Sequence, residues 1–141
     1  MEINLASILL IDDDTDLAEL YVVVSKRLGH SLLWVEQKDQ ISKALSSSEF
    51  DLIILDDKLG PDLSIDILPE ISKEFGEAAL RKIAVLTSSL PDQDYIEQVN
   101  SYGIKGVFEK VPGVSGAQQQ LQDLVNAKPL VPPQFEEVLP E

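Results

Sequence analysis

The stretch SILLIDDD at residues 7–14 places four consecutive aliphatic residues directly before three consecutive aspartates. An unbroken aliphatic run of this length is typical of a β-strand buried on both faces, because a strand with one wet face alternates apolar and polar residues. The pattern recurs in LIILD at 52–56 and IAVLTSS at 83–89, and a shorter apolar pair begins VFEK at 107–110. These segments predict strands of a buried parallel sheet, each followed by polar residues.

The segments between these runs carry apolar residues at helical spacing. We expect a further strand over residues 32–35, and helices over residues 15–28, 39–45, 64–75, 91–99 and 115–127. Pro69 falls inside the third helix and predicts a late start or a kink there. Five strands alternating with five helices predict an α/β protein, a parallel sheet with helices on both faces in three α/β/α layers.

The bulk composition limits the partners and the compartment. The chain has 141 residues, which fits one domain, and we expect that domain over residues 1–128 with a Pro- and Glu-rich tail over 129–141. It has no cysteine, which excludes disulfides and thiolate metal sites. The net charge of −14 disfavours binding to nucleic acid or to an anionic membrane. The N-terminus resembles neither a signal peptide nor a membrane span, so we expect a cytoplasmic protein.

Polar side chains follow four of the five predicted strands. They are Asp12, Asp13 and Asp14 after the first run, Asp56 and Asp57 after the third strand, Thr87 after the fourth and Lys110 after the fifth. Ligands of open α/β sheets bind where the strands end, so these groups should meet at one edge. A single such Asp is most simply a helix cap, and Asp14 is the best candidate for one.

The combination of these groups points to phosphoryl chemistry with a metal. Carboxylates from two strand ends repel one another, and Mg²⁺ relieves this because it prefers oxygen ligands and leaves room for phosphate oxygens. A carboxylate beside the metal can attack an activated phosphoryl group. A lysine and a hydroxyl can neutralise the oxygens of the transferred group.

On these four motifs the chain resembles response-regulator receiver domains over about residues 5–128. The resemblance implies a flavodoxin-like fold, a doubly wound five-stranded parallel sheet of order 2-1-3-4-5 with five helices. It implies that Asp12 and Asp13 bind Mg²⁺ and that Asp56, which directly follows the aliphatic run, is the phosphoacceptor and a metal ligand. Thr87 and Lys110 would contact the phosphoryl group.

The same resemblance adds the backbone carbonyl of Lys58 as a metal ligand. It implies a stand-alone signalling switch that takes a phosphoryl group from a sensor histidine kinase or a histidine phosphotransfer protein and then acts on a downstream protein target. Such a protein is no enzyme beyond its own phosphorylation and slow dephosphorylation. Neither a nucleic-acid nor a membrane partner is expected, and the sequence does not determine the oligomeric state.

The chain departs from the family pattern at three positions. The loop after Asp56 carries its proline at Pro61, behind Gly60, and Val111 separates Lys110 from Pro112. Val107 occupies the position, three before the lysine, where the family usually has the aromatic residue that works with Thr87. These departures keep open a receiver-fold binding module that works without phosphorylation.

A second alternative is a haloacid-dehalogenase-type phosphatase, because Asp12 to Thr15 is similar to its nucleophile motif. The order of motifs disfavours that alternative, since the second acidic pair precedes Thr87 and Lys110.

Two smaller expectations concern structure alone. We expect His30 to be a surface residue near a turn, and Gln118–Gln120 to form a polar helix face without further role.

Overall fold

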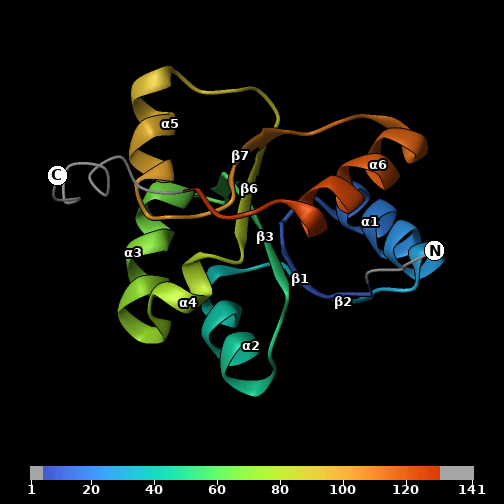
Figure 1. Cartoon of the computed structure of the whole chain (residues 1–141), viewed down its shortest axis with the longest axis horizontal. Helices are drawn as coiled ribbons and strands as arrows, with labels where there is room; N and C mark the ends of the chain where they lie inside the picture. The colour runs from blue at the N-terminus through green and yellow to red at the C-terminus, as the bar shows by residue number, and fades with distance from the viewer. Residues whose placement is uncertain (1–4, 131–141) are drawn as a thin grey trace, which may run out of the picture.

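The computed structural model describes residues 5–130. Its centre is a parallel five-stranded sheet in the order β2-β1-β3-β6-β7 (Figure 1). The strands are β1 (Ser7–Ile11), β2 (Ser31–Val35), β3 (Leu52–Asp56), β6 (Ile83–Thr87) and β7 (Gly106–Glu109). Numbered within the sheet alone, this order is 2-1-3-4-5, so the predicted doubly wound α/β fold is confirmed.

Both faces of the sheet are covered by helices. One face carries α1 (Thr15–Leu28) and α6 (Gly113–Asn126), which lie side by side on the right of Figure 1. The other carries α2 (Ile41–Ser47), α3 (Ser64–Phe75), α4 (Glu77–Leu80) and α5 (Gln93–Asn100), with a short 3₁₀ turn at Lys38–Gln40 before α2. The result is the predicted three-layer arrangement.

The aliphatic runs divide their side chains between two cores. Along β1, Ile8 and Leu10 pack against α1 and α6, whereas Leu9 and Ile11 pack against the helices of the other face. β3 and β6 alternate in the same way. Successive strand residues point to opposite faces, so a strand covered on both sides needs an apolar residue at every position.

Three local features differ from the prediction. The described residues hold six α-helices, because a single turn, α4, follows Gly76 in a stretch too short to show a helical period. A small hairpin of β4 (Lys58–Leu59) and β5 (Asp62–Leu63) folds around the Gly60-Pro61 turn. Helix α3 begins at Ser64 and continues through Pro69, so its predicted late start is wrong. Pro69 is exposed, so water can reach the carbonyl that loses its N–H partner.

His30 is buried, and its predicted surface position is wrong. Its Nδ1 accepts the Ala6 backbone N–H at 2.9 Å, which leaves Nε2 to donate to Gln122 Oε1 at 3.0 Å. The neutral ring therefore ties the start of β1 to α6.

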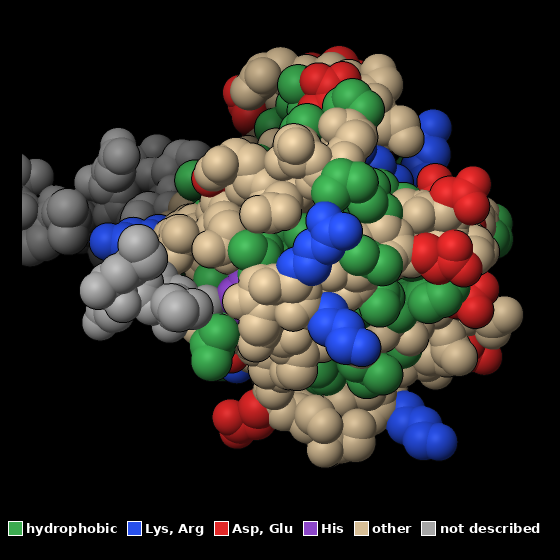
Figure 2. Space-filling model, turned by 90° about the vertical axis from the view of Figure 1, so that its right-hand side faces the viewer, with side chains coloured by type: hydrophobic (Ala, Val, Ile, Leu, Met, Phe, Trp, Pro, Cys, Tyr) green, Lys and Arg blue, Asp and Glu red, His purple; other side chains and the backbone are tan. Residues whose placement is uncertain are grey.

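The outer surface of α1 and α6 mixes apolar and basic groups. Figure 2 shows hydrophobic side chains between Lys and Arg side chains on this face, and the exposed valines here include Val22, Val23 and Val114. Within residues 5–130, no helix combines the length and the apolar character needed to cross a bilayer. Of the predicted tail, residues 131–141 lie outside the described part of the chain.

Candidate functional site

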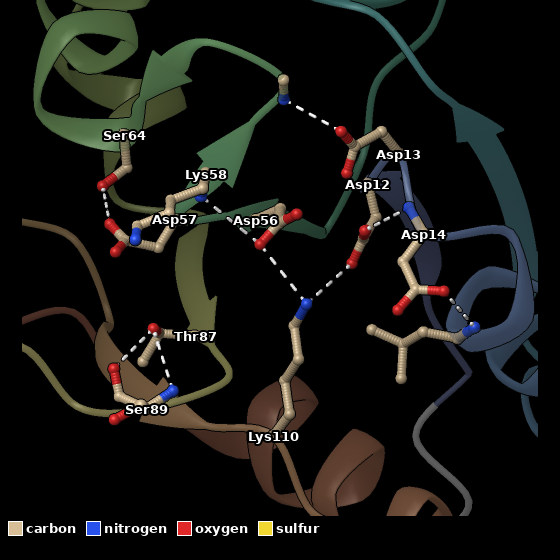
Figure 3. Close-up of polar contacts among 12 residues, drawn as sticks. Asp12, Asp13, Asp14, Asp56, Asp57, Lys58, Ser64, Thr87, Ser89 and Lys110 are labelled. Carbon is tan, nitrogen blue, oxygen red and sulfur yellow. Dashed lines mark hydrogen bonds and ion pairs between the residues drawn. The ribbon is translucent and has the colours of Figure 1, made fainter.

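Three aspartates meet where β1 and β3 end. Asp12 directly follows β1 and Asp56 ends β3, and these strands are hydrogen-bonded neighbours. One carboxylate oxygen from each of Asp12, Asp13 and Asp56 lies within 4.8 Å of the others (Figure 3). Asp12 and Asp56 are buried, whereas Asp13 is exposed. The arrangement gathers three negative charges with one open side.

Lys110 brings a positive charge to this cluster. Its Nζ lies 3.3 Å from Asp56 Oδ1 and 3.4 Å from Asp12 Oδ2. The residue follows β7, and its backbone N–H donates to the Thr87 carbonyl at 2.8 Å. Although β6 separates β7 from β3 in the sheet, the long lysine side chain spans that gap (Figure 3).

Burial makes the two inner carboxylates difficult to ionise together. Burial, and then the Asp12 charge, raise the pKa of Asp56 to about 7. Burial is also the main reason that the pKa of Asp12 is raised, although Lys110 opposes the shift. The Asp12 and Asp56 charges raise the pKa of Lys110 despite its burial. The lysine therefore stays charged, and the site favours an additional cation.

The donor set fits Mg²⁺. All the side-chain donors are carboxylate oxygens, which this hard cation prefers. Asp12 Oδ2 is buried and accepts no hydrogen bond among the described residues, although Lys110 lies beside it as an ion-pair partner. A divalent cation could bind this oxygen, which has unused acceptor capacity, together with the two neighbouring carboxylates.

The three consecutive aspartates have different environments. Asp13 Oδ2 accepts the Gly60 N–H at 2.9 Å, which joins the end of β1 to the β4–β5 hairpin. Asp14 caps α1 and accepts the N–H groups of Asp16 and Leu17, as predicted. Asp12 accepts the N–H of Asp14 through Oδ1. Asp12 and Asp13 therefore remain to bind a metal, while Asp14 stabilises the helix.

Asp57 points away from the cluster, into a network that the sequence did not indicate. Its Oδ1 accepts the hydroxyl of Ser64 at 2.7 Å and that of Tyr95 at 2.8 Å. Ser64 begins α3 and Tyr95 lies on α5, so one carboxylate joins both helices to the end of β3. The available signal was the period of two along a strand, which sends Asp56 and Asp57 to opposite sides.

Thr87 and Lys58 stand beside the cluster without completing it. The Thr87 hydroxyl is buried and donates to the Ser89 carbonyl at 2.8 Å, and no hydrogen bond joins it to Asp56 within residues 5–130. The Lys58 N–H makes a long hydrogen bond to Asp56 Oδ1, at 3.4 Å. A metal contact of the Lys58 carbonyl stays a prediction. Val107, the residue at the aromatic position, is half-buried.

The sequence matches no family model and no curated protein. The fold, in contrast, is that of response-regulator receiver domains. The chemotaxis response regulator CheY4 of Vibrio cholerae is similar with a TM-score of 0.71 and 15% identity, over 86% of this chain and 99% of that one. NtrX from Brucella abortus is similar with a TM-score of 0.69 and 21% identity, over 86% of this chain. The match spans 27% of the NtrX chain.

A third similar structure contains ligands. A response regulator protein from Burkholderia pseudomallei has a TM-score of 0.69 and 20% identity, with 94% of this chain and 69% of that chain covered. That protein was solved with a phosphorylated aspartic acid, a calcium ion and citrate. At these identities the similarity establishes the receiver fold of this chain, and the function depends on the residues of its own site.

Proposed function

We propose that this chain is a response-regulator receiver that accepts a phosphoryl group on Asp56 in a Mg²⁺-dependent reaction in the cytoplasm. The donor would be the phosphohistidine of a sensor histidine kinase or of a histidine phosphotransfer protein. The observation that carries the proposal is the position of the Lys110 ammonium, within 3.4 Å of both Asp12 and Asp56. There the ammonium lies beside the proposed acceptor, where it could neutralise the oxygens of a transferred phosphoryl group.

Asp12, Asp13, Asp56 and the Lys58 carbonyl would hold the metal. Bound Mg²⁺ would supply positive charge for the oxygens of the phosphoryl group. An oxygen of ionised Asp56 would attack phosphorus as the bond to the donor histidine nitrogen breaks. Lys110 would then bind an oxygen of the transferred group, because its ammonium already lies beside the acceptor.

Asp56 must lose its proton before it can act as a nucleophile. With a pKa of about 7, only about half of this carboxyl is ionised near neutral pH. A cation held by Asp12 and Asp13 favours the ionised form. The same cation that stabilises the product would thereby prepare the acceptor.

Thr87 would complete the site after a rotation of its side chain. Its hydroxyl now donates to the Ser89 carbonyl and must leave this acceptor to reach a phosphoryl oxygen. Such a rotation would draw on the segment between β6 and α5 and would signal to a downstream protein target. We propose no enzymatic turnover beyond the protein's own phosphorylation and its slow reversal.

Incubation with Mg²⁺ and acetyl phosphate, followed by intact-mass measurement, tests this function. We expect a mass increase of one phosphoryl group that disappears in Asp56→Asn and in the presence of a chelator. Asp57→Asn is the matched control, because Asp57 has the same chemistry one residue away and faces Ser64 and Tyr95. It should still form the adduct. An adduct that survives in Asp56→Asn would show that another residue is modified.

One observation favours a second candidate, a binding module that works without phosphorylation. The Thr87 hydroxyl is engaged with Ser89, and Val107 has no aromatic ring to move with it. A wild-type protein that binds Mg²⁺ but forms no adduct with acetyl or carbamoyl phosphate would support this candidate.

A further inference from the structure

Lys110 lies on a connection that has little regular structure of its own. It follows the last residue of β7 and precedes Val111 and Pro112, and α6 begins at Gly113. All peptide bonds of residues 5–130 are trans, so no cis-proline fixes this turn. The backbone must nevertheless be held in place, because the ammonium has to lie within 3.4 Å of two carboxylates.

Gln120 binds the backbone on both sides of Lys110. Its Nε2 donates to the Glu109 carbonyl at 2.8 Å, and its Oε1 accepts the Val111 N–H at 3.3 Å. The side chain is buried on α6, with 8% of its surface exposed. One amide group thus brackets the lysine, so the prediction that Gln118–Gln120 is merely a polar helix face is wrong for Gln120.

Tyr21 fixes the orientation of this amide. Its hydroxyl donates to Gln120 Oε1 at 2.8 Å, and its ring is fully buried on α1. Burial raises the pKa of Tyr21, so the hydroxyl keeps its proton. With a fixed donor at Oε1, the amide must direct Nε2 at Glu109, and a flipped amide would leave two buried donors facing each other.

Gly116 provides space for the same segment. A Cβ at this position would lie 2.4 Å from Cγ1 of Val111. The Val111 side chain therefore packs directly on the first turn of α6, and only a glycine permits this approach. Gln120 and Gly116 together hold Val111, the residue after Lys110, against α6.

We infer that Gln120, oriented by Tyr21, is a positioning residue that holds the Lys110 ammonium between Asp12 and Asp56. That Lys110 then binds a phosphoryl oxygen rests on the proposed function. That Gln120 positions Lys110 rests on the hydrogen bonds described above. Gln120 touches neither the carboxylates nor a phosphoryl group. It acts only through Lys110, and this makes the inference testable by a double-mutant cycle.

The cycle compares Gln120→Leu, Lys110→Met and the double variant by two measurements. The first is the rate of phosphorylation by acetyl phosphate. We expect Lys110→Met to slow it on the order of 100-fold and Gln120→Leu on the order of tenfold. The double variant should equal Lys110→Met alone, because Gln120 has nothing left to position.

The second measurement is Mg²⁺ affinity, with the metal alone as the probe. Trp34 is the single tryptophan, and its Nε1 donates to the Asp12 carbonyl at 2.8 Å, so its fluorescence reports on the site. An ammonium between the carboxylates opposes a second cation. Mg²⁺ should therefore bind about tenfold more tightly in Lys110→Met and about threefold more tightly in Gln120→Leu. The Mg²⁺ affinity of the double variant should again equal that of Lys110→Met alone.

Gln118→Leu is the matched control, with the same substitution two residues away on α6, and should leave both measurements unchanged. If Gln120→Leu does not fold, Tyr21→Phe removes one hydroxyl and should shift both measurements in the same direction by a smaller factor. Effects of Gln120→Leu and Lys110→Met that multiply, or a Gln120→Leu effect no larger than that of Gln118→Leu, would overturn the inference.

The two proposals fail in different ways. A wild type that takes up no phosphoryl group refutes the proposed function and leaves the Mg²⁺ cycle to decide on Gln120. A wild type whose fluorescence and stability do not respond to Mg²⁺ refutes the metal site of the proposed function and leaves the phosphorylation cycle to decide on Gln120.

Discussion

Asp56 and Asp57 are neighbours in the chain with opposite surroundings. Asp56 faces Asp12 and Lys110, and Asp57 faces two hydroxyl donors from α3 and α5. Asp57 accepts two short hydrogen bonds from hydroxyls, whereas Asp56 accepts a long one from the Lys58 N–H and shares the Lys110 ammonium with Asp12. Asp56, the proposed acceptor, is thus the one of the two that lies against other carboxylates.

Competition between a proton and Mg²⁺ at Asp56 should make metal binding depend on pH. Because the pKa of Asp56 is raised to about 7, a proton occupies the carboxyl at lower pH and must leave before the metal binds. We expect the apparent Mg²⁺ affinity to rise about tenfold between about pH 6 and about pH 8. Titration followed by Trp34 fluorescence measures this.

Asp56→Asn is the control for this pH dependence, because an amide cannot take up the proton. Its weaker Mg²⁺ affinity should change much less over the same pH range. An equal pH dependence in the wild type and in Asp56→Asn would place the titrating group elsewhere.

At the scale of elements, α5 is held to the sheet by few contacts. Of its eight residues only Val99 is buried, and the Tyr95 hydroxyl adds the hydrogen bond to Asp57. A helix with so small a buried face should depend strongly on a single polar anchor. The anchor joins α5 to Asp57, the residue next to the proposed phosphoacceptor.

Tyr95→Phe should therefore loosen α5 while the sheet stays intact. A hydrogen bond to a carboxylate contributes about 1.5–3 kcal/mol, and its loss should lower the free energy of unfolding by roughly that amount or less. Amide hydrogen exchange should speed up in α5 and not in β1 or β3. Tyr102→Phe is the control, since the Tyr102 hydroxyl makes no hydrogen bond within residues 5–130. Similar exchange in both variants would contradict the anchor.

The elements that the sequence predicts well are those whose signal is repeated along the chain. β1, β3 and β6 each carry four consecutive aliphatic residues, and α1 has both its cap at Asp14 and its stop at Gly29. The convergence of Asp12, Asp56 and Lys110 follows from the strand order once these elements are placed. One turn of helix at α4 and two-residue strands at β4 and β5 are too short to show a period.

The residues that sequence reasoning placed wrongly are those whose partners lie far away in the chain. His30 bonds to Gln122, and Gln120 bonds to Tyr21, which is 99 positions away. A polar residue on a helix shows no local sign of burial. Only the packing of α6 on α1 determines which of three consecutive glutamines turns inward.

At the scale of the whole molecule, the fold stabilises a charge arrangement that is unfavourable by itself. Two apolar cores enclose a sheet whose carboxyl ends hold Asp12 and Asp56 close together and out of water. The burial of these carboxylates opposes folding whenever both are ionised. The free energy of unfolding of the metal-free protein should therefore depend on whether these carboxylates are ionised, and so on pH.

The direction in which stability changes with pH follows from the pKa of Asp56. The pKa of this carboxyl is near its ordinary value of 3.8 in the unfolded chain and about 7 in the folded one, so between these values the folded protein binds more protons. Stability from this group is fully present below 3.8 and is lost as the pH rises through 7. Without metal, we expect the Tm to be higher at about pH 5.5 than at about pH 8, by on the order of 5 °C.

Asp56→Asn and Mg²⁺ separate this effect from the titration of the many other acids. In Asp56→Asn the difference between the two pH values should shrink, because the asparagine is neutral at both. Mg²⁺ should raise the Tm of the wild type at about pH 8 more than at about pH 5.5, since it binds the ionised site of the folded state. Scanning calorimetry of both proteins at the two pH values, with and without Mg²⁺, measures these Tm values. If wild type and Asp56→Asn lose the same stability as the pH rises, the pH dependence arises outside Asp56, and burial of the Asp56 charge does not destabilise the fold.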